Sequence, residues 1–172
     1  ETTAKLISEG NVVGWYQGKM EWGPRALGNR SILADPRNAK MKYILNEKIK
    51  HRESFRPFAP CILEEYAFEY FDIDVPSPYM LLVAPVKKPE KIPAVTHVDG
   101  TGRLQTISKD TNPLFYDLIN EFYKITSVPV LVNTSMNVRG EPIVNTPKQA
   151  YNMIIKTDMD YIVLGNHIVK KQ

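Results

Sequence analysis

Short apolar runs alternate irregularly with helical patterns along the chain, and this alternation limits the folds that it can adopt. Runs of four or five residues that are typical of buried strands lie at residues 12–16, 31–34, 59–63, 80–83, 104–107, 128–132 and 161–164, with 168–169 expected to extend the last. Helical patterns lie at residues 2–9, 36–50, 64–71 and 113–126, and Thr146-Pro147 begins a further helix. Some strands are close enough for antiparallel pairing. We therefore predict a mixed α and β fold, with helices flanking a twisted mixed β-sheet.

Length and composition narrow the class of protein. With 172 residues and 43% hydrophobic content, residues 1–172 are expected to form a single domain with its own core. The chain begins at Glu1 and enters a helical pattern at once, so we expect it to be part of a longer protein. A net charge of +3 argues against duplex nucleic acid as the main partner. One cysteine suits the cytoplasm, and no apolar run reaches the roughly 18 residues of a membrane span.

The stretch from Trp22 to Arg37 combines turn-forming residues with three arginines. It reads W-G-P-R-A-L-G-N-R-S-I-L-A-D-P-R, in which glycines and prolines predict turns and Asp35-Pro36 predicts a helix start. Arg25 and Arg30 then lie on a stiff loop beside a strand end, which suits phosphate binding. The alternative is that these arginines are solvated or pair with carboxylates, and local chemistry leaves both interpretations open.

A second basic cluster follows the helical pattern at residues 36–50, in the sequence K-H-R-E-S-F-R-P-F-A-P. Lys48 and Lys50 fit the usual role of basic residues at a helix C-terminus. That role does not explain Arg56, which lies between Phe55 and Pro57 in an apolar run. We expect the Arg56 side chain to be half-buried and to need an anionic partner.

Two polar segments complete the candidate site. His97 and Arg103 flank a turn-forming segment, in which Asp99 is expected to bond the backbone; the alternative places His97 and Arg103 in a binding site. The loop at residues 133–142 offers hydroxyl and amide groups to phosphate oxygens or an adenine edge. Ligands of such sheets prefer the loops at strand ends, so the composite prediction is a cationic pocket for polyphosphate.

Four stretches together resemble the C-terminal domain of the O-carbamoyltransferases of nodulation and antibiotic biosynthesis. They are G-K-M-E-W-G-P-R-A-L-G-N-R-S-I-L-A-D-P-R, K-H-R-E-S-F-R-P-F-A-P, P-A-V-T-H-V-D-G-T-G-R-L-Q-T and V-P-V-L-V-N-T-S-M-N-V-R-G-E-P-I-V, in the family's order. The resemblance implies a YrdC-like three-layer fold. The Lys-x-Arg and Ser-x-Asn signatures of that fold have counterparts in Lys50-His51-Arg52 and Ser135-Met136-Asn137.

The resemblance also implies an activity. In the family, the YrdC-like domain cleaves carbamoyl phosphate to carbamate, which attacks the α-phosphate of ATP to give carbamoyl adenylate and pyrophosphate. An N-terminal domain of the actin-like fold then transfers the carbamoyl group to a substrate hydroxyl. ATP is the implied cofactor, with Mg²⁺ held by the nucleotide and water rather than by a dedicated protein site.

Residue roles follow from the same resemblance. The phosphate and carbamoyl clamp is expected to consist of Arg25, Lys50, Arg56 and Arg103, with Arg52 as their neighbour. Two alternative functions remain open, one enzymatic and one non-catalytic. These are a threonylcarbamoyl-adenylate synthase and a non-catalytic module that binds nucleotide or RNA.

Neutral side chains are expected to complete the binding site. Ser135 and Asn137 are assigned to phosphate or carbamoyl oxygens, and Asn133, Arg139 and His97 are further candidates.

Overall fold

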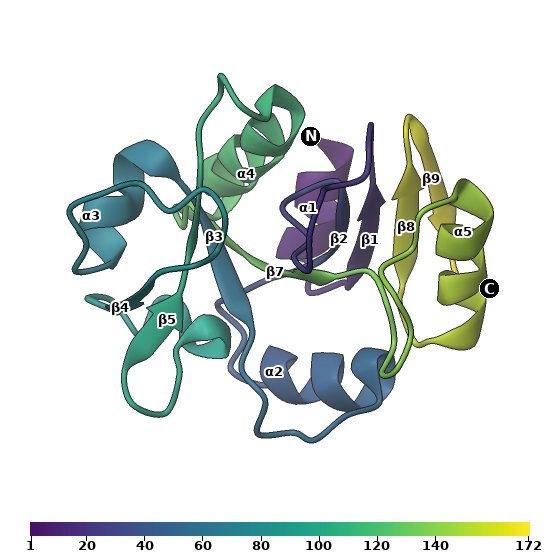
Figure 1. The fold of residues 1–172 in the computed structure, drawn as a ribbon, viewed down its shortest axis with the longest axis horizontal. Helices are drawn as coiled ribbons and strands as arrows, with labels where there is room; N and C mark the ends of the chain where they lie inside the picture. Colours follow the sequence, from purple (N-terminus) through teal and green to yellow (C-terminus); the bar gives the residue numbers. More distant parts are fainter.

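The computed structural model describes residues 1–172 and contains a seven-stranded mixed sheet (Figure 1). The strand order is β6-β3-β7-β2-β1-β8-β9. The bounds are β1 Val13–Tyr16, β2 Arg30–Ala34, β3 Ala59–Leu63, β6 Gln105–Ile107, β7 Val130–Ser135, β8 Tyr161–Leu164 and β9 His167–Lys170. The pairs β1–β8 and β3–β6 are parallel, and the others are antiparallel. The predicted mixed sheet is confirmed.

Helices pack on the sheet from more than one side. Helices α1 (Thr2–Ser8) and α4 (Pro113–Thr126) lie together above β7 in Figure 1, whereas α2 (Met41–Ile44) lies below it. The π-helix η1 (Leu45–Lys50) continues α2, and α5 (Pro147–Lys156) packs against β8 and β1. The remaining elements are η2 (Glu64–Tyr66), α3 (Ala67–Tyr70), η3 (Pro93–Val95) and a separate two-stranded sheet of β4 (Val83–Pro85) and β5 (Thr101–Arg103).

The two longest helices begin where the sequence predicts. The Asn112 side chain accepts a hydrogen bond from the Phe115 backbone N–H at 3.2 Å, and proline follows at the first helical position of α4. At α5, Thr146 and Gln149 form a capping box.

Burial explains the apolar runs. Every residue of β2 and β3 is buried, because both strands are interior to the sheet and covered by helices. Nearly all of the buried hydrophobic residues form one continuous cluster. No helix is both long and apolar enough to cross a membrane.

The helix expected at residues 36–50 begins instead at Met41, so the predicted cap by Asp35 is wrong. The Asp35 carboxylate binds the Arg37 guanidinium, with Oδ2 2.6 Å from Nη2, and is therefore engaged elsewhere. The helix ends at His51, which adopts the left-handed conformation with φ of 49°.

Three strand predictions also need correction. The strand expected at 80–83 forms only at Val83–Pro85, where it pairs with residues 101–103, expected to form a turn. Residues 168–169 lie in β9, which turns back at Gly165 (φ 59°) rather than extending β8. Strand β7 runs to Ser135, since its pairing with β2 continues to that residue.

Candidate active site: an arginine cavity free of carboxylates

The sheet topology brings four separate segments to one place. The C-terminal end of β7 lies between β3 and β2, with Asn133 opposite Ala59 and Ser135 opposite Ser31. The segment before β3 carries the second basic cluster, and the loop before β2 carries Arg25. Strand β5 adds Arg103 from the small sheet. Residues that are far apart in the sequence therefore converge beside the end of β7.

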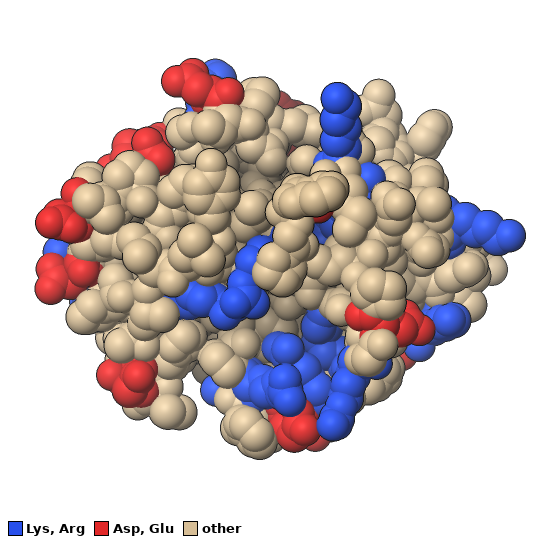
Figure 2. Space-filling model, viewed as in Figure 1, with Lys and Arg blue, Asp and Glu red and all other residues tan.

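The convergence forms a cavity with two parts. The inner recess, of about 110 Å³, is lined by Arg25, Arg52 and Arg103 together with Asn133, Thr134, Ser135 and apolar residues. The outer basin, of about 530 Å³, shares the three arginines and adds Phe55, Arg56, Val83 and His97. Neither part is lined by an Asp or Glu. Figure 2 shows lysine and arginine side chains gathered below the centre of this face, between β5 and η1.

Arg25 and Arg103 have few partners within the protein. No hydrogen bond is made by the Arg25 side chain, and the Arg103 guanidinium hydrogen-bonds only to the Met80 sulfur, at 3.9 Å. The Nε atoms of both arginines are buried without a partner. Burial lowers the pKa of Arg103, and the charge of Arg25 lowers it further. These two cations lack a counter-charge, which an anionic ligand can supply.

The Arg52 side chain is held in place by more contacts than those of Arg25 and Arg103. Its Nε donates to Asn46 Oδ1 at 2.7 Å, and its guanidinium lies 4.8 Å from the centre of the Phe58 ring. The pKa of Arg52 is lowered by burial first, then by the charges of Arg56 and Arg103, with Glu53 opposing. The remaining donors of Arg52 are held at the cavity wall in a fixed direction.

Asn46 is a positioning residue that sequence reasoning missed. It is fully buried, and its Nδ2 donates to the backbone oxygens of Ser54 and Arg56 at 3.2 and 2.9 Å. These bonds shape the loop that presents the basic cluster. A signal was present, because Asn46 lies one helical turn before Ile49 and interrupts an otherwise apolar stripe.

Lys50 lies behind the cavity wall. Its Nζ donates to the backbone oxygens of Ser135 and Asn137, both at 2.8 Å, and to Asn137 Oδ1 at 2.7 Å. Burial lowers its pKa to about 7, and Arg52 adds to the effect. With Ser135 Oγ at 3.4 Å, four oxygen acceptors surround Nζ, so Lys50 joins η1 to the Ser135–Asn137 segment. The Lys-x-Arg and Ser-x-Asn counterparts thus meet in space.

The arginines at the rim share a carboxylate. Arg56 Nε lies 2.8 Å from Glu53 Oε2, and the Arg56 side chain is 49% exposed, so the expected anionic partner is present. Arg139 Nη1 lies 3.3 Å from Glu53 Oε1, and Arg139 is exposed and does not line the cavity. Asn137 also stays outside the lining, because its Oδ1 accepts from Lys50 and Ser135.

His97 lines the outer basin beside a turn. Its Nδ1 lies 3.1 Å from Thr101 Oγ1, and burial lowers the pKa of the imidazole while Asp99 opposes the shift. Asp99 Oδ1 accepts from the Thr101 backbone N–H at 3.0 Å, which confirms the predicted turn. The turn and the site are therefore compatible.

Arg30 and Arg37 belong to the structure around the site rather than to its lining. Arg30 is only 3% exposed, donates to the backbone oxygens of Gln17, Asn29 and Gly18, and lies 3.6 Å from the centre of the Tyr16 ring. Arg37 binds Asp35 through two nitrogens. Pairing with a carboxylate is thus confirmed for Arg37, whereas Arg30 bonds backbone oxygens, and phosphate binding by Arg25 stays a prediction.

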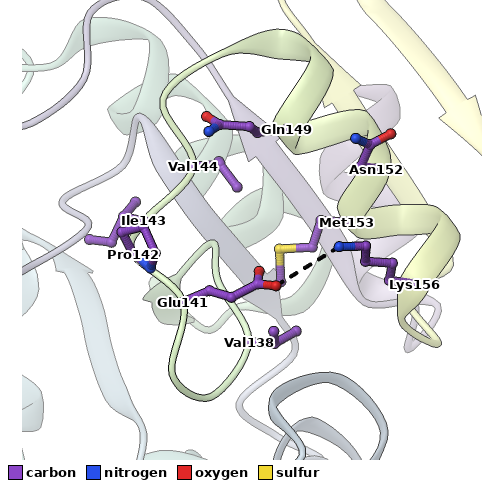
Figure 3. A pocket seen from close by; sticks show the side chains of 9 residues that line it. All are labelled: Val138, Glu141, Pro142, Ile143, Val144, Gln149, Asn152, Met153 and Lys156. Atoms are coloured by element: carbon purple, nitrogen blue, oxygen red, sulfur yellow. Dashed lines mark ion pairs between the residues drawn. The ribbon is translucent and has the colours of Figure 1, made fainter.

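A separate hollow of about 240 Å³ lies between α5 and the loop after β7 (Figure 3). Its charged residues are Glu141 and Lys156, which point toward one another across it at 3.9 Å. The opposite charges balance, and the hollow contains no arginine. It lacks the uncompensated positive charge of the cavity.

Comparison with known sequences gives the family. The profile of the family described as "Carbamoyltransferase C-terminus" matches residues 4–171. The chain belongs to this carbamoyltransferase family. The domain is 48% identical to nodulation protein NolNO of Sinorhizobium fredii and 49% identical to nodulation protein NolO of Bradyrhizobium diazoefficiens, over 98% and 99% of its length. It spans only 26% and 32% of those two proteins. The resemblance to the nodulation type is thus confirmed.

Solved structures confirm the YrdC-like fold of the carbamoyltransferase domain. A full-length HypF in its phosphate- and nucleotide-bound form matches 96% of the domain with a TM-score of 0.67, at 19% identity and over 20% of its own length. Sua5 from P. abyssi, complexed with L-threonine, matches 95% with a TM-score of 0.65, at 16% identity and over 46% of its own length. At these identities the likeness concerns the fold alone.

Proposed function

We propose that this domain makes carbamoyl adenylate and pyrophosphate from carbamoyl phosphate and ATP. The observation that carries the proposal is the inner recess, where Arg25, Arg52 and Arg103 converge without a carboxylate. Two polyanions have to be held together in this reaction, and fixed cations lower the cost of bringing them close. The family membership supports the carbamoyl group as the unit that is activated.

The geometry suits the two chemical stages. Hydrolysis of carbamoyl phosphate by one water yields carbamate and phosphate, and a carbamate oxygen then attacks the α-phosphorus of ATP, from which pyrophosphate leaves. Negative charge gathers on the phosphoryl oxygens during attack, and preorganised guanidinium groups stabilise that charge. Thr134 adds a neutral hydroxyl donor to the recess, while the larger outer basin accommodates the triphosphate. The full-length HypF that contains a similar fold was solved in a phosphate- and nucleotide-bound form, with which the proposal is compatible.

Lys50 and the rim arginines have distinct proposed roles. Lys50 keeps the Ser135–Asn137 segment in place, so that Ser135 and its backbone face the ligand. Arg56 and His97 contact the nucleotide from the outer basin, whereas Arg139 acts on Arg56 through their shared partner Glu53. Since the cavity lining contains no carboxylate, Mg²⁺ is carried by the phosphate oxygens of ATP and by water.

The product requires a second catalytic unit. Carbamoyl adenylate is proposed to pass to an N-terminal domain of the actin-like fold in the same polypeptide, which transfers the carbamoyl group to a substrate hydroxyl in the cytoplasm. The relatives support this organisation, because this domain corresponds to only a third or less of their length.

The direct test is pyrophosphate release from ATP, Mg²⁺ and carbamoyl phosphate, with Arg103→Met as the site variant and Arg37→Met as the matched control. We expect release that depends on carbamoyl phosphate, is lost in Arg103→Met and persists in Arg37→Met. Release that requires threonine and bicarbonate instead would establish the threonylcarbamoyl-adenylate alternative. RNA binding that falls steeply with salt, without ATP consumption, would identify a non-catalytic module.

A further inference from the structure

The inner recess contains one acceptor among its unpaired buried atoms. Three of its lining residues carry buried side-chain atoms that have no hydrogen-bond partner: Arg25 Nε, Arg103 Nε and Asn133 Oδ1. Two of these atoms donate and one accepts. A ligand made only of anionic oxygens satisfies the two donors and leaves the acceptor unpaired. The recess therefore matches a ligand that has both oxygens and an N–H group.

The orientation of the Asn133 amide is determined by a chain of hydrogen bonds. Gln105 Nε2 donates to the Leu27 backbone oxygen at 2.9 Å, so Gln105 Oε1 faces Asn133. Asn133 Nδ2 then donates to Gln105 Oε1 at 2.8 Å and to the Ala26 backbone oxygen at 3.1 Å. The Leu27 and Ala26 carbonyls only accept, so rotating either amide breaks the chain. Oδ1 is thus the amide atom that remains for a ligand.

Because the Asn133 Oδ1 atom is buried, a hydrogen bond to it contributes more to ligand binding than one to an exposed oxygen. Asn133 is 1% exposed, and folding has already removed its Oδ1 from water. A ligand N–H that reaches it gains a hydrogen bond without first stripping water from the oxygen, whereas an apolar group leaves it buried and unpaired. A site of this kind rejects an analogue that lacks the donor.

We propose that Asn133 selects the amino group of the activated acyl donor, accepting a hydrogen bond from the carbamoyl –NH₂ at Oδ1. Since it rests on the proposed carbamoyl chemistry, this role deepens that function by distinguishing carbamoyl from acetyl donors. The arginines of the recess hold the oxygens on the other side of the same group. Gln105 acts as a positioning residue, because it fixes the amide without lining the recess.

Two stable analogues isolate the amino group. Phosphonoacetamide and acetonylphosphonate carry the same phosphonate and carbonyl and differ by –NH₂ against –CH₃. Binding of each to the 172-residue chain is measured by calorimetry for the unchanged protein and for Asn133→Leu, with Asn152→Leu at an exposed position of α5 as the matched control. We expect the unchanged protein and Asn152→Leu to prefer phosphonoacetamide by about tenfold, the equivalent of one buried hydrogen bond. Asn133→Leu is expected to lose this preference while it still binds inorganic phosphate.

Each other outcome overturns a defined part of the proposal. Equal binding of the two analogues to the unchanged protein overturns amino-group selection, and this comparison needs no variant to fold. A preference that persists in a folded Asn133→Leu assigns the selection to another residue. If neither analogue nor inorganic phosphate binds, the anion site of the proposed function fails as well, and the two failures are thereby distinguished.

Discussion

Arg25, in the loop before β2, and Arg30, the first residue of β2, lie five residues apart and differ in what their guanidinium groups contact. Arg30 is buried, donates to three backbone oxygens and stacks on Tyr16. Arg25 makes no hydrogen bond and lines the cavity with Arg52 and Arg103. The difference shows that an arginine in a motif can stabilise the fold or bind a ligand, depending on whether its donors are already engaged. Substitutions should therefore separate stability from ligand binding.

The largest effect on stability is expected from Arg30→Met. The substitution removes three hydrogen bonds and the stacking on Tyr16, and it leaves the buried bond to the Gln17 oxygen unmade, so we expect the free energy of unfolding to fall by about 3 kcal/mol. Urea denaturation measures this change in the free energy of unfolding. Arg25→Met, in the loop before β2, is the control and is expected to unfold at nearly the same urea concentration as the unchanged protein. A loss in Arg25→Met equal to that in Arg30→Met would remove the distinction.

Arg103→Met is expected to lower the reaction rate without lowering the stability of the protein. We expect pyrophosphate release to fall by about 100-fold, because one fixed cation at the reacting phosphates is lost. The free energy of unfolding should stay the same or rise, since burial and Arg25 already disfavour the charge and lower the pKa of Arg103. Denaturation and initial rates are measured on the same preparations. If Arg103→Met loses stability but retains its rate, Arg103 has a structural role like that of Arg30.

A smaller effect is expected from Glu53→Gln, which releases Arg56 and Arg139 from their shared carboxylate. The change makes the rim more positive, so we expect affinity for inorganic phosphate to rise by a factor of about 3 at low salt and less at high salt. Glu69→Gln, which removes the partner of Lys88, is the matched control. Unchanged affinity in Glu53→Gln would show that the rim arginines do not act on the site.

The smallest effect concerns pH and His97. Burial lowers the pKa of His97, so the imidazole is neutral near pH 7, and an anion bound in the basin raises that pKa again. Anion binding is then linked to proton uptake, and affinity should rise as pH falls. Relative to His97→Gln, we expect the unchanged protein to gain about twofold in phosphate affinity between pH 7.5 and 5.5. The ratio cancels the titration of phosphate itself, and a ratio constant with pH would contradict the linkage.

Local chemistry and resemblance together predicted much of the fold. The apolar runs and capping residues located the interior strands and the helices α4 and α5. The misplaced elements depend on tertiary pairing, which no local pattern encodes. Asp35 looks like a helix cap until Arg37 engages its carboxylate, and residues 101–103 look like a turn until they pair with β4.

For the candidate site as well, residue identities could be predicted, whereas their tertiary contacts could not. The resemblance named Arg25, Arg52 and Arg103, and the structure brings these three to one recess. It did not indicate that Lys50 is engaged by protein oxygens or that Asn46 orients Arg52. Those facts follow from the packing of η1 against the segment after β7, which local patterns do not determine.

A crystal structure of the chain with phosphonoacetamide tests the central claim most directly. We predict the phosphonate oxygens within hydrogen-bonding distance of the Arg25, Arg52 and Arg103 guanidinium groups, with the amide –NH₂ beside Asn133 Oδ1. Arg30 should keep its three backbone oxygens. A ligand bound in the hollow beside α5 (Figure 3), or an empty arginine recess at saturating ligand, would contradict the account.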